Sequence, residues 1–377
     1  MTERIYEKDS YIADFSAAVL ECQKTDNGYA VVLDATAFFP EGGGQFGDTG
    51  TIDGVKVFDT QIKDGIIYHY TEDAVRLGTS VGCKLNFSRR FAFMQNHSGE
   101  HIVSAVTKKL YGLNNVGFHL GEDFVTVDFD GELTREQLCA IETAVNEYVW
   151  KNLPITAYYP MPTELESIDY RSKKQIDGDV RLVEIKGCDI CACCAPHVKN
   201  TGEIGIVKLL DFERMRGGVR IVIKCGRFAL DDYRVKYDNI ANISALLSAK
   251  QDKAFESVNI LDEKFTSERQ KNIELKKKIA DMTVDCADSS TKYIFLSDCE
   301  TKDLQLIADR LYKKHGGIRA AFSGEDENFS FAICGNDAEL QEFFAKFKAK
   351  LNVRGGGRNG MVQGAVLETA EKIKLCF

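Results

Sequence analysis

Two short motifs in the sequence carry side chains that commonly bind transition metals. The first is His-Ser-Gly-Glu-His, in which His97 and His101 stand four residues apart. On a helix, this spacing places both imidazoles on one face, one turn apart. The second is Cys-Cys-Ala-Pro-His, which supplies Cys193 and His197 at the same spacing. Three nitrogens and one thiolate suit tetrahedral zinc, so we predict a Zn²⁺ site at His97, His101, Cys193 and His197.

Each motif taken alone has another explanation. A single pair of histidines at this spacing often binds no metal, and Cys193 belongs to a group of four cysteines between Cys188 and Cys194 that could compete for one. His-Ser-Gly-Glu-His also fits the pattern of the inverted zinc peptidases, in which Glu100 would be the general base. Those enzymes take a carboxylate as third ligand and would leave Cys193 and His197 without a role. We therefore do not expect a peptidase.

The elements that must position these motifs follow from the spacing of apolar residues. From Tyr11 to about Leu85, short alternating runs broken by glycine and aspartate indicate a small β-barrel. Helical periodicity at Gln95–Leu110 places the first motif on a helix, and a second helix is expected at Arg135–Trp150. The expected strands after the barrel are Phe124–Phe129, Val180–Ile185, Ile204–Leu210 and Val219–Ile223. This mixture predicts an α+β fold.

A long segment without glycine follows, between Gly226 and Gly316. From about Tyr233 to Met282 its apolar residues recur at steps of three and four, which indicates a long amphipathic helix or a helical hairpin with coiled-coil character. Such a helix needs an apolar partner, either in its own chain or in a second copy. A homodimer through this segment and the C-terminal domain is therefore one expectation.

The last part of the chain returns to alternating strand and helix patterns, which suggest a small α/β domain. We divide the chain into a β-barrel domain (1–88), a zinc-dependent domain (89–230), a helical linker (231–285) and a C-terminal domain with a glycine-rich motif (290–377).

Composition limits the class of protein. The 377 residues carry a formal charge of −9 and are 44% hydrophobic, with neither an apolar N-terminal run nor a stretch long enough to span a membrane. We expect a cytoplasmic protein, in which the 12 cysteines are buried hydrophobes or metal ligands rather than disulfides. The negative charge argues against nonspecific coating of nucleic acid, although local basic patches would still allow binding of a tRNA.

Four motifs together resemble a known family. The glycine-rich run Thr36–Gly50 resembles the signature of the alanyl-tRNA synthetase editing domain, and Asn96–His101 resembles its first zinc motif. Cys193–His197, followed by Thr201–Gly205, resembles the second zinc motif. The run Gly355–Gly364 resembles the C-terminal domain of the same synthetases. No aminoacylation domain precedes these motifs, so the resemblance is to the free-standing editing proteins called AlaX, in their long form.

The resemblance implies a hydrolase that removes wrongly attached amino acids from tRNA-Ala. An alanine pocket rejects serine weakly and cannot sterically exclude glycine, so the expected substrates are tRNA-Ala carrying serine or glycine. Hydrolysis of the ester needs a positioned water and stabilisation of the developing oxyanion. Zinc would act on substrate or water directly, or would organise the pocket.

Within this resemblance, the glycine-rich run would form the substrate site. Gly42, Gly43 and Gly44 would let the backbone approach the terminal adenosine, and Gln45 would offer it a donor and an acceptor. Thr36 lies where the family has a residue that contacts the seryl hydroxyl. The alternatives are that Gln45 braces a loop and that Thr36 ends a strand.

The candidate catalytic residues are Gln45, Thr36 and Glu100. Arg354 and Arg358 are expected to bind tRNA phosphates, because neighbouring glycines also expose backbone N–H groups. Further basic residues that could contact RNA are Arg89, Arg90, Lys108, Lys109, Lys173 and Lys174.

The second zinc motif departs from the family pattern. The family commonly has Cys-Gly-Gly-Thr-His, whereas this chain has Cys194, Ala195 and Pro196 between the two ligands. This change favours an alternative function, a catalytically inactive tRNA-binding module with a structural zinc. A third alternative is the related editing domain of threonyl-tRNA synthetase, but the Gly-Gly-Gly-Gln run and the C-terminal motif favour alanyl over threonyl.

Overall fold

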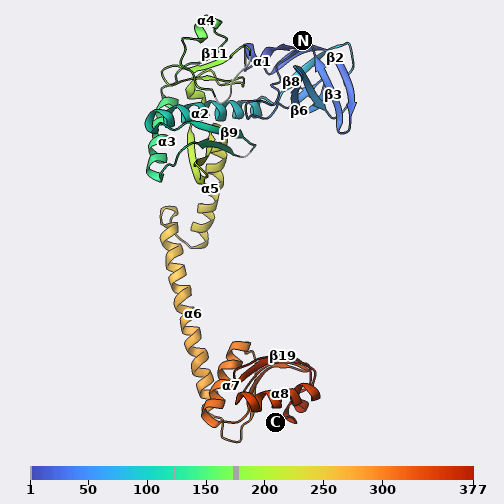
Figure 1. The fold of residues 1–377 in the computed structure, drawn as a ribbon, viewed down its shortest axis with the longest axis vertical. Coiled ribbons are helices and arrows are strands. Elements are labelled where there is room, and N and C mark those ends of the chain that lie inside the picture. Colours follow the sequence, from blue (N-terminus) through green and yellow to red (C-terminus); the bar gives the residue numbers. More distant parts are fainter. Residues whose placement is uncertain (1, 123, 173–177) are drawn as a thin grey trace. The chain divides into compact units, whose positions relative to one another are not determined.

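The computed structural model describes residues 2–122, 124–172 and 178–377. They form two compact units, Met1–Asn239 and Ile240–Phe377. Both units combine helices with β-sheets (Figure 1), so the predicted α+β class is confirmed. The four segments predicted from the sequence are not separated by this division, and their boundaries stay predictions. In the described part of the chain, no helix has the length and apolar character needed to cross a bilayer.

The first unit begins with a closed β-barrel, where the sequence predicts one. Its strands, in the order β2-β3-β7-β6-β5-β8, are β2 (Asp14–Thr25), β3 (Gly28–Leu33), β5 (Gly50–Ile52), β6 (Val55–Lys63), β7 (Ile66–Thr71) and β8 (Ser80–Leu85). Burial alternates along β8, as expected for a strand with one face in the core. The Asp53-Gly54 and Asp64-Gly65 pairs have positive φ and close two tight hairpins. This explains why glycine and aspartate interrupt the alternating runs of the sequence.

A short N-terminal segment joins the barrel to the rest of the first unit. It contains β1 (Glu3–Arg4) and α1 (Ile5–Lys8). Strand β1 pairs in parallel with β4 (Ala35–Thr36), so the residues before the glycine-rich run are anchored on the N-terminal strand.

The second part of this unit is built around α2 (Phe87–Tyr111), which carries the first metal motif. Residues 92–107 of α2 are all buried, because the helix packs against both α3 (Arg135–Trp150) and an antiparallel sheet (Figure 1). That sheet, in the order β14-β15-β10-β9, consists of β9 (Asn115–Leu120), β10 (Val125–Phe129), β14 (Val207–Met215) and β15 (Gly218–Cys225).

A second, three-stranded sheet carries the approach to the second metal motif. It pairs β11 (Ile155–Tyr158), β12 (Leu182–Ile185) and β13 (Asp189–Ala192) in that order, and α4 (Pro162–Leu165) lies in the connection between β11 and β12.

Two predicted elements in this unit begin three or more residues away from the predicted start. Helix α2 begins eight residues before Gln95, because the Asn86 side chain accepts a hydrogen bond from the Arg89 N–H and caps the helix. The strand expected at Ile204–Leu210 begins only at Val207. The preceding residues Thr201–Ile204 form a 3₁₀ turn that ends at Gly205, whose φ is 80°.

The long helical segment is interrupted. Helix α5 (Gly226–Leu246) ends before Ser248, which has a positive φ of 51°, and a 3₁₀ turn at Gln251–Lys253 leads into α6 (Ala254–Asp285). An unbroken helix from Tyr233 to Met282 was therefore wrong, because two helices occupy this segment, and the helical hairpin stays a prediction.

The second unit contains a five-stranded sheet in the order β16-β17-β18-β20-β19. Its strands are β16 (Tyr293–Leu296), β17 (Arg319–Glu325), β18 (Asn328–Cys334), β19 (Val353–Gly356) and β20 (Met361–Val366). Its helices are α7 (Thr301–His315), α8 (Asp337–Lys350) and α9 (Ala370–Lys374). Along β17, Ala321 packs with α6 and α7, while Ala320 and Phe322 pack with α8 and α9 on the other face. The sheet is thus covered on both faces.

Candidate metal centre

The two metal motifs meet in the first unit, as the sequence predicts. His97 and His101 project from one face of α2, and the loop after β13 brings Cys193 and His197 to them. All four ligand atoms lie within 4.8 Å of one another. The Cys193 Sγ is 3.5 Å from His97 Nε2 and 3.4 Å from His197 Nε2. A tetrahedral zinc with ordinary Zn–N and Zn–S bonds requires an N–S separation of about 3.6 Å, so the set fits this metal.

Each histidine is oriented through its second ring nitrogen. Nδ1 of His97 lies 3.1 Å from the Gln45 carboxamide oxygen, and Nδ1 of His197 lies 3.0 Å from the Ser98 hydroxyl. Nδ1 of His101 faces a carboxylate oxygen of Asp189 at 3.4 Å. These contacts leave Nε2 of each ring for a metal, in the arrangement usual for metal-binding histidines.

Burial isolates the centre from water. His97 and His101 are 2% exposed, and His197 is 6% exposed, whereas Cys193 is only partly buried. Burial raises the pKa of the Cys193 thiol well above its usual range. A bound cation would oppose this effect, because metal coordination stabilises the thiolate.

Asp189 behaves as a paired carboxylate. Burial alone would raise its pKa, but the contacts with His101 and Arg171 lower the pKa below its usual value. The carboxylate therefore remains charged beside the metal ligand.

The packing of the Cys-Cys-Ala-Pro-His loop explains why it contains an alanine. The Ala195 methyl is fully buried against Tyr6, Phe39 and Ile67, so this side chain joins the loop to the barrel. The guanidinium of Arg181 donates to the carbonyls of Cys193 and Ala195 and fixes the loop from the other side.

The glycine-rich run turns back sharply beside the centre. Gly43 and Gly44 have φ of 61° and 84°, and a Cβ at Gly44 would lie 2.9 Å from the Phe118 carbonyl oxygen and ring. The Leu120 N–H donates to the Gly44 carbonyl, so the turn is held against β9. Gln45, which follows, is completely buried.

The structure places the other predicted catalytic residues in buried contacts. Glu100 is fully buried, and its Oε1 accepts hydrogen bonds from Ser104 and Asn115 at 2.6 and 2.5 Å. Thr36 ends β4, where its hydroxyl lies 2.8 Å from His69 Nε2 and accepts the Phe38 N–H. These contacts agree with bracing roles, and the proposed catalytic roles of Glu100 and Thr36 stay proposals.

Arg90, one of the basic residues that could contact RNA, is instead buried in the protein. Its side chain is 0% exposed, and its Nε donates to Asp48 at 2.9 and 3.0 Å, while Nη1 and Nη2 donate to the Ser10 and Ala37 carbonyls. This buried pair ties α2 to the glycine-rich run, seven residues before His97 on the same helix.

The remaining predicted basic residues lie elsewhere. Arg354 and Arg358 are exposed in the second unit, while Lys173 and Lys174 lie outside the described residues.

The sequence analysis did not identify three residues that support the metal ligands, namely Asp189, Arg171 and Ser98. The signal that could have identified Asp189 is its position just before Cys193 in the cysteine-rich run.

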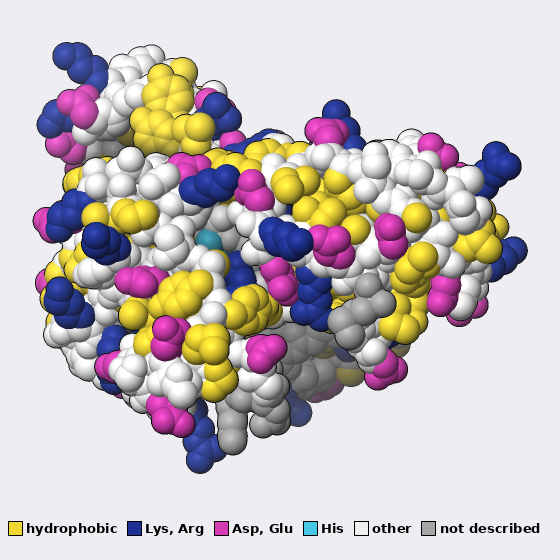
Figure 2. Space-filling model, turned by 90° about the horizontal axis from the view of Figure 1, so that it is seen from above, with side chains coloured by type: hydrophobic (Ala, Val, Ile, Leu, Met, Phe, Trp, Pro, Cys, Tyr) yellow, Lys and Arg dark blue, Asp and Glu magenta, His cyan; other side chains and the backbone are white. Residues whose placement is uncertain are grey.

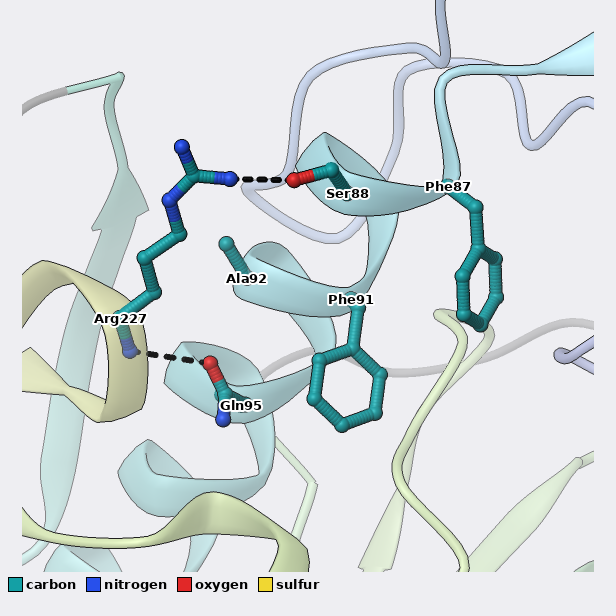
Figure 3. Close-up of a pocket in the computed structure, with 6 residues that line it drawn as sticks. All are labelled: Phe87, Ser88, Phe91, Ala92, Gln95 and Arg227. Atoms are coloured by element: carbon teal, nitrogen blue, oxygen red, sulfur yellow. Dashed lines mark hydrogen bonds between the residues drawn. The ribbon is translucent and has the colours of Figure 1, made fainter.

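A surface hollow of about 240 Å³ lies at the start of α2. In Figure 3, Phe87, Phe91 and Arg227 surround it, and the Arg227 guanidinium is held by the Ser88 hydroxyl. An α-helix turns by about 100° per residue, so Gln95 at the base of this hollow points away from the side that carries His97. The hollow is therefore separate from the metal centre.

Figure 2 shows a histidine at the bottom of another hollow on the surface, with both basic and acidic side chains around it.

Two regions of the chain match models of tRNA synthetase families. Residues 180–222, which include Cys193 and His197, match the family model described as "Threonyl and Alanyl tRNA synthetase second additional domain". Residues 7–89, which include the glycine-rich run, match the model for class II (A) tRNA synthetases. The chain is thus similar to domains of tRNA synthetases in two separate regions.

Individual relatives include alanyl-tRNA editing proteins. The chain is 29% identical to alanyl-tRNA editing protein AlaX-L of Pyrococcus horikoshii, over 99% of this chain and 96% of the relative. It is 25% identical to alanyl-tRNA editing protein Aarsd1 of Mus musculus, over 97% and 94% of the two chains. An alanine–tRNA ligase of Methanococcus maripaludis is 28% identical, over 99% of this chain but 43% of the ligase.

The resemblance to long-form alanyl-tRNA editing proteins is confirmed by these matches over nearly the full length. A crystal structure of the C-Ala domain of Aquifex aeolicus alanyl-tRNA synthetase also matches, with 22% identity and a TM-score of 0.19, over 22% of this chain and 83% of that domain.

Proposed function

We propose that this protein hydrolyses the aminoacyl ester of tRNA-Ala that carries serine or glycine. The observation that supports the proposal most is the His97, His101, Cys193 and His197 cluster, assembled from two motifs of a chain that resembles alanyl-tRNA editing proteins throughout. The nitrogen and sulfur donors fit Zn²⁺ better than Mg²⁺ or Ca²⁺, which prefer oxygen ligands. We take the enzyme to be a cytoplasmic aminoacyl-tRNA deacylase.

Zinc in this centre would supply a positive charge that polarises an ester or a water. The residues of the chain orient the ligands: Gln45, Asp189 and Ser98 each contact one imidazole. Burial of the histidines leaves Cys193 as the most exposed ligand. We therefore place the substrate ester on the side of Cys193.

The aminoacyl end would lie between the glycine turn and the second metal motif. A Cβ added at Gly43 would be 3.6 Å from Cys194 Sγ, and Cys194 is exposed, so the turn and this thiol border the same surface. We propose that Gly42, Gly43 and Gly44 contact the terminal adenosine there. Gln45 would act by holding His97, and Thr36 and Glu100 would support the site from the protein interior.

The deciding experiment measures deacylation of Ser-, Gly- and Ala-tRNA-Ala by the full chain. We expect hydrolysis of the serine or glycine ester, little hydrolysis of Ala-tRNA-Ala, and loss of activity with a zinc chelator. The double variant His97→Ala, His101→Ala should lose both bound zinc and activity. His119→Ala, which changes an exposed histidine on β9, is the control and should keep both.

Two outcomes would favour other functions. Binding of tRNA-Ala without any hydrolysis would indicate the inactive module with a structural zinc. Faster hydrolysis of Ser-tRNA-Thr would indicate threonyl editing, because the family model that matches residues 180–222 covers both synthetases. Stoichiometric zinc in the double histidine variant would instead move the metal to the Cys188–Cys194 group.

A further inference from the structure

An ion pair lies directly behind one of the proposed metal ligands. Arg171 donates to Asp189 through Nε at 2.7 Å and through Nη2 at 2.6 Å, so the two side chains form a bidentate pair. Oδ2 of the same carboxylate lies 3.4 Å from Nδ1 of His101. The side chains of Asp189 and His101 are 3% and 2% exposed, so this contact is shielded from water.

Backbone hydrogen bonds also hold the two residues of this pair side by side. Asp189 begins β13, and Arg171 lies alongside that strand, since its N–H donates to Ile190 and its carbonyl accepts from Ala192. Arg171 Nη2 also points toward the His101 carbonyl at 3.5 Å. The Arg171 guanidinium therefore contacts both β13, through Asp189, and α2, through His101.

This cluster is not a second metal site. His101, Asp189 and Cys191 bring potential ligand atoms within 4.8 Å of one another. However, both oxygens of Asp189 already accept hydrogen bonds from Arg171, and a second cation a few ångströms from that guanidinium would be repelled. The carboxylate is instead available to the ring N–H of His101.

We infer that Asp189, held in place by Arg171, is the positioning residue for His101 in the metal centre. An acceptor at Nδ1 keeps the proton on that nitrogen and leaves the Nε2 lone pair for the metal. In this structure Nδ1 of His101 is buried and forms no hydrogen bond of ordinary geometry, and it faces the Asp189 carboxylate oxygen at 3.4 Å. This inference rests on the metal centre of the proposed function.

Asp189 differs from the residues that hold the other two rings. Gln45 and Ser98 are neutral, whereas Asp189 offers a charged acceptor, and hydrogen bonds to charged acceptors are stronger than those between neutral groups. At 3.4 Å this contact is longer than those of Gln45 and Ser98, at 3.1 and 3.0 Å, so its contribution to metal affinity comes from the charge of the carboxylate.

The test is the zinc affinity of the full chain, measured without tRNA by competition with a chromogenic chelator. Asp189→Asn should weaken zinc binding by roughly 10- to 100-fold, the range typical for loss of such a contact. Asp128→Asn is the matched control, because Asp128 forms a bidentate pair with Arg220, at 2.7 and 2.8 Å, in the same part of the protein. It should bind zinc like the wild type. Equal affinity of Asp189→Asn and wild type would overturn the inference.

A second measurement separates positioning from ligation. In the Co²⁺-substituted protein, Asp189→Asn should keep the d–d absorption bands of the wild type, because the four ligands are unchanged. Altered bands would show that Asp189 is itself a ligand and would overturn the inference. If Asp189→Asn does not fold, Asp189→Glu replaces it, since the longer side chain moves the carboxylate while keeping its charge. Weaker zinc binding by Asp189→Glu supports the inference, and wild-type affinity overturns it.

The proposed function can fail independently. Tight zinc binding that depends on Asp189, in a protein that does not deacylate tRNA, would uphold the inference and reject the enzyme. A wild-type chain that binds no zinc would reject both.

Discussion

The carboxamide oxygen of Gln45 lies 3.1 Å from Nδ1 of His97, although 52 residues separate them. This contact joins the glycine-rich run, which leaves the barrel, to the helix that carries the first two metal ligands. Gln45 can accept the ring proton only while Nε2 is the free nitrogen of His97. The position of the glycine turn and the geometry of the metal centre are therefore linked.

This link predicts that Gln45→Leu lowers both zinc affinity and deacylation. The leucine fills similar volume but cannot accept the His97 proton, so the ring loses its fixed orientation. We expect zinc binding to weaken by at least about tenfold, as for loss of other contacts of this kind. Gln23→Leu, which changes an exposed amide on β2 of the barrel, is the control. Unchanged zinc affinity in Gln45→Leu would mean that the contact does not orient the ring.

Arg90→Met should strongly destabilise the first unit. The change leaves the Asp48 carboxylate buried without its cation, which typically costs roughly 3–5 kcal/mol. The single tryptophan, Trp150, belongs to this unit, so its fluorescence in urea reports the relevant transition. Lys56→Met breaks an exposed pair with Glu72 and should cost less than about 1 kcal/mol. Equal stability of the two variants would show that the Arg90–Asp48 pair contributes no more than a surface pair.

His69 should make folding sensitive to mild acid. Burial lowers its pKa from 6.5 to about 4, so the folded state favours the neutral ring. The stability that this provides is fully present above pH 6.5 and is lost as the pH falls from 6.5 toward 4. The loss amounts to about 3 kcal/mol. His69→Gln should show a smaller decrease in unfolding free energy over this range, and an identical decrease would contradict the assignment.

Helix α6 should mediate self-association. Phe255 and Phe265 are 77% and 66% exposed, and Met282 is 68% exposed, which is unusual for large apolar side chains on one helix. We expect the full chain to sediment as a dimer and the variant Phe255→Glu, Phe265→Glu to sediment as a monomer. Glu263→Gln, on the same helix, should not change the result. A monomeric wild type would exclude a dimer through this segment.

Arg354 and Arg358 should contribute to tRNA affinity rather than to chemistry. Each phosphate contact adds roughly one unit to the slope of log affinity against log salt, so Arg354→Ala, Arg358→Ala should flatten this slope by about two units. Deacylation at saturating tRNA should stay unchanged. Lys346→Ala, which removes an exposed lysine on α8 of the same unit, is the control. A variant with the wild-type slope would remove these arginines from the tRNA interface.

The elements that depend on nearby residues were largely predictable. A four-residue spacing puts His97 and His101 on one face of a helix regardless of the rest of the chain, and Asp-Gly pairs mark hairpins through their own backbone preferences. The break in the long helix was harder to predict, because the apolar spacing continues on both sides of it. In the structure, the positive φ at Ser248 marks the break.

The sequence by itself determined the ligand types, the helix that carries half of them and the family resemblance, since these rest on local spacing. Only the tertiary structure decided which polar groups surround the ligands. Arg90 resembles a surface arginine until Asp48 and the Ser10 and Ala37 carbonyls enclose it, and Asp189 gains its role only because β13 brings it beside His101. The cost of burying a charge depends on partners that arrive from distant parts of the chain, so local sequence cannot tell a buried ion from an exposed one.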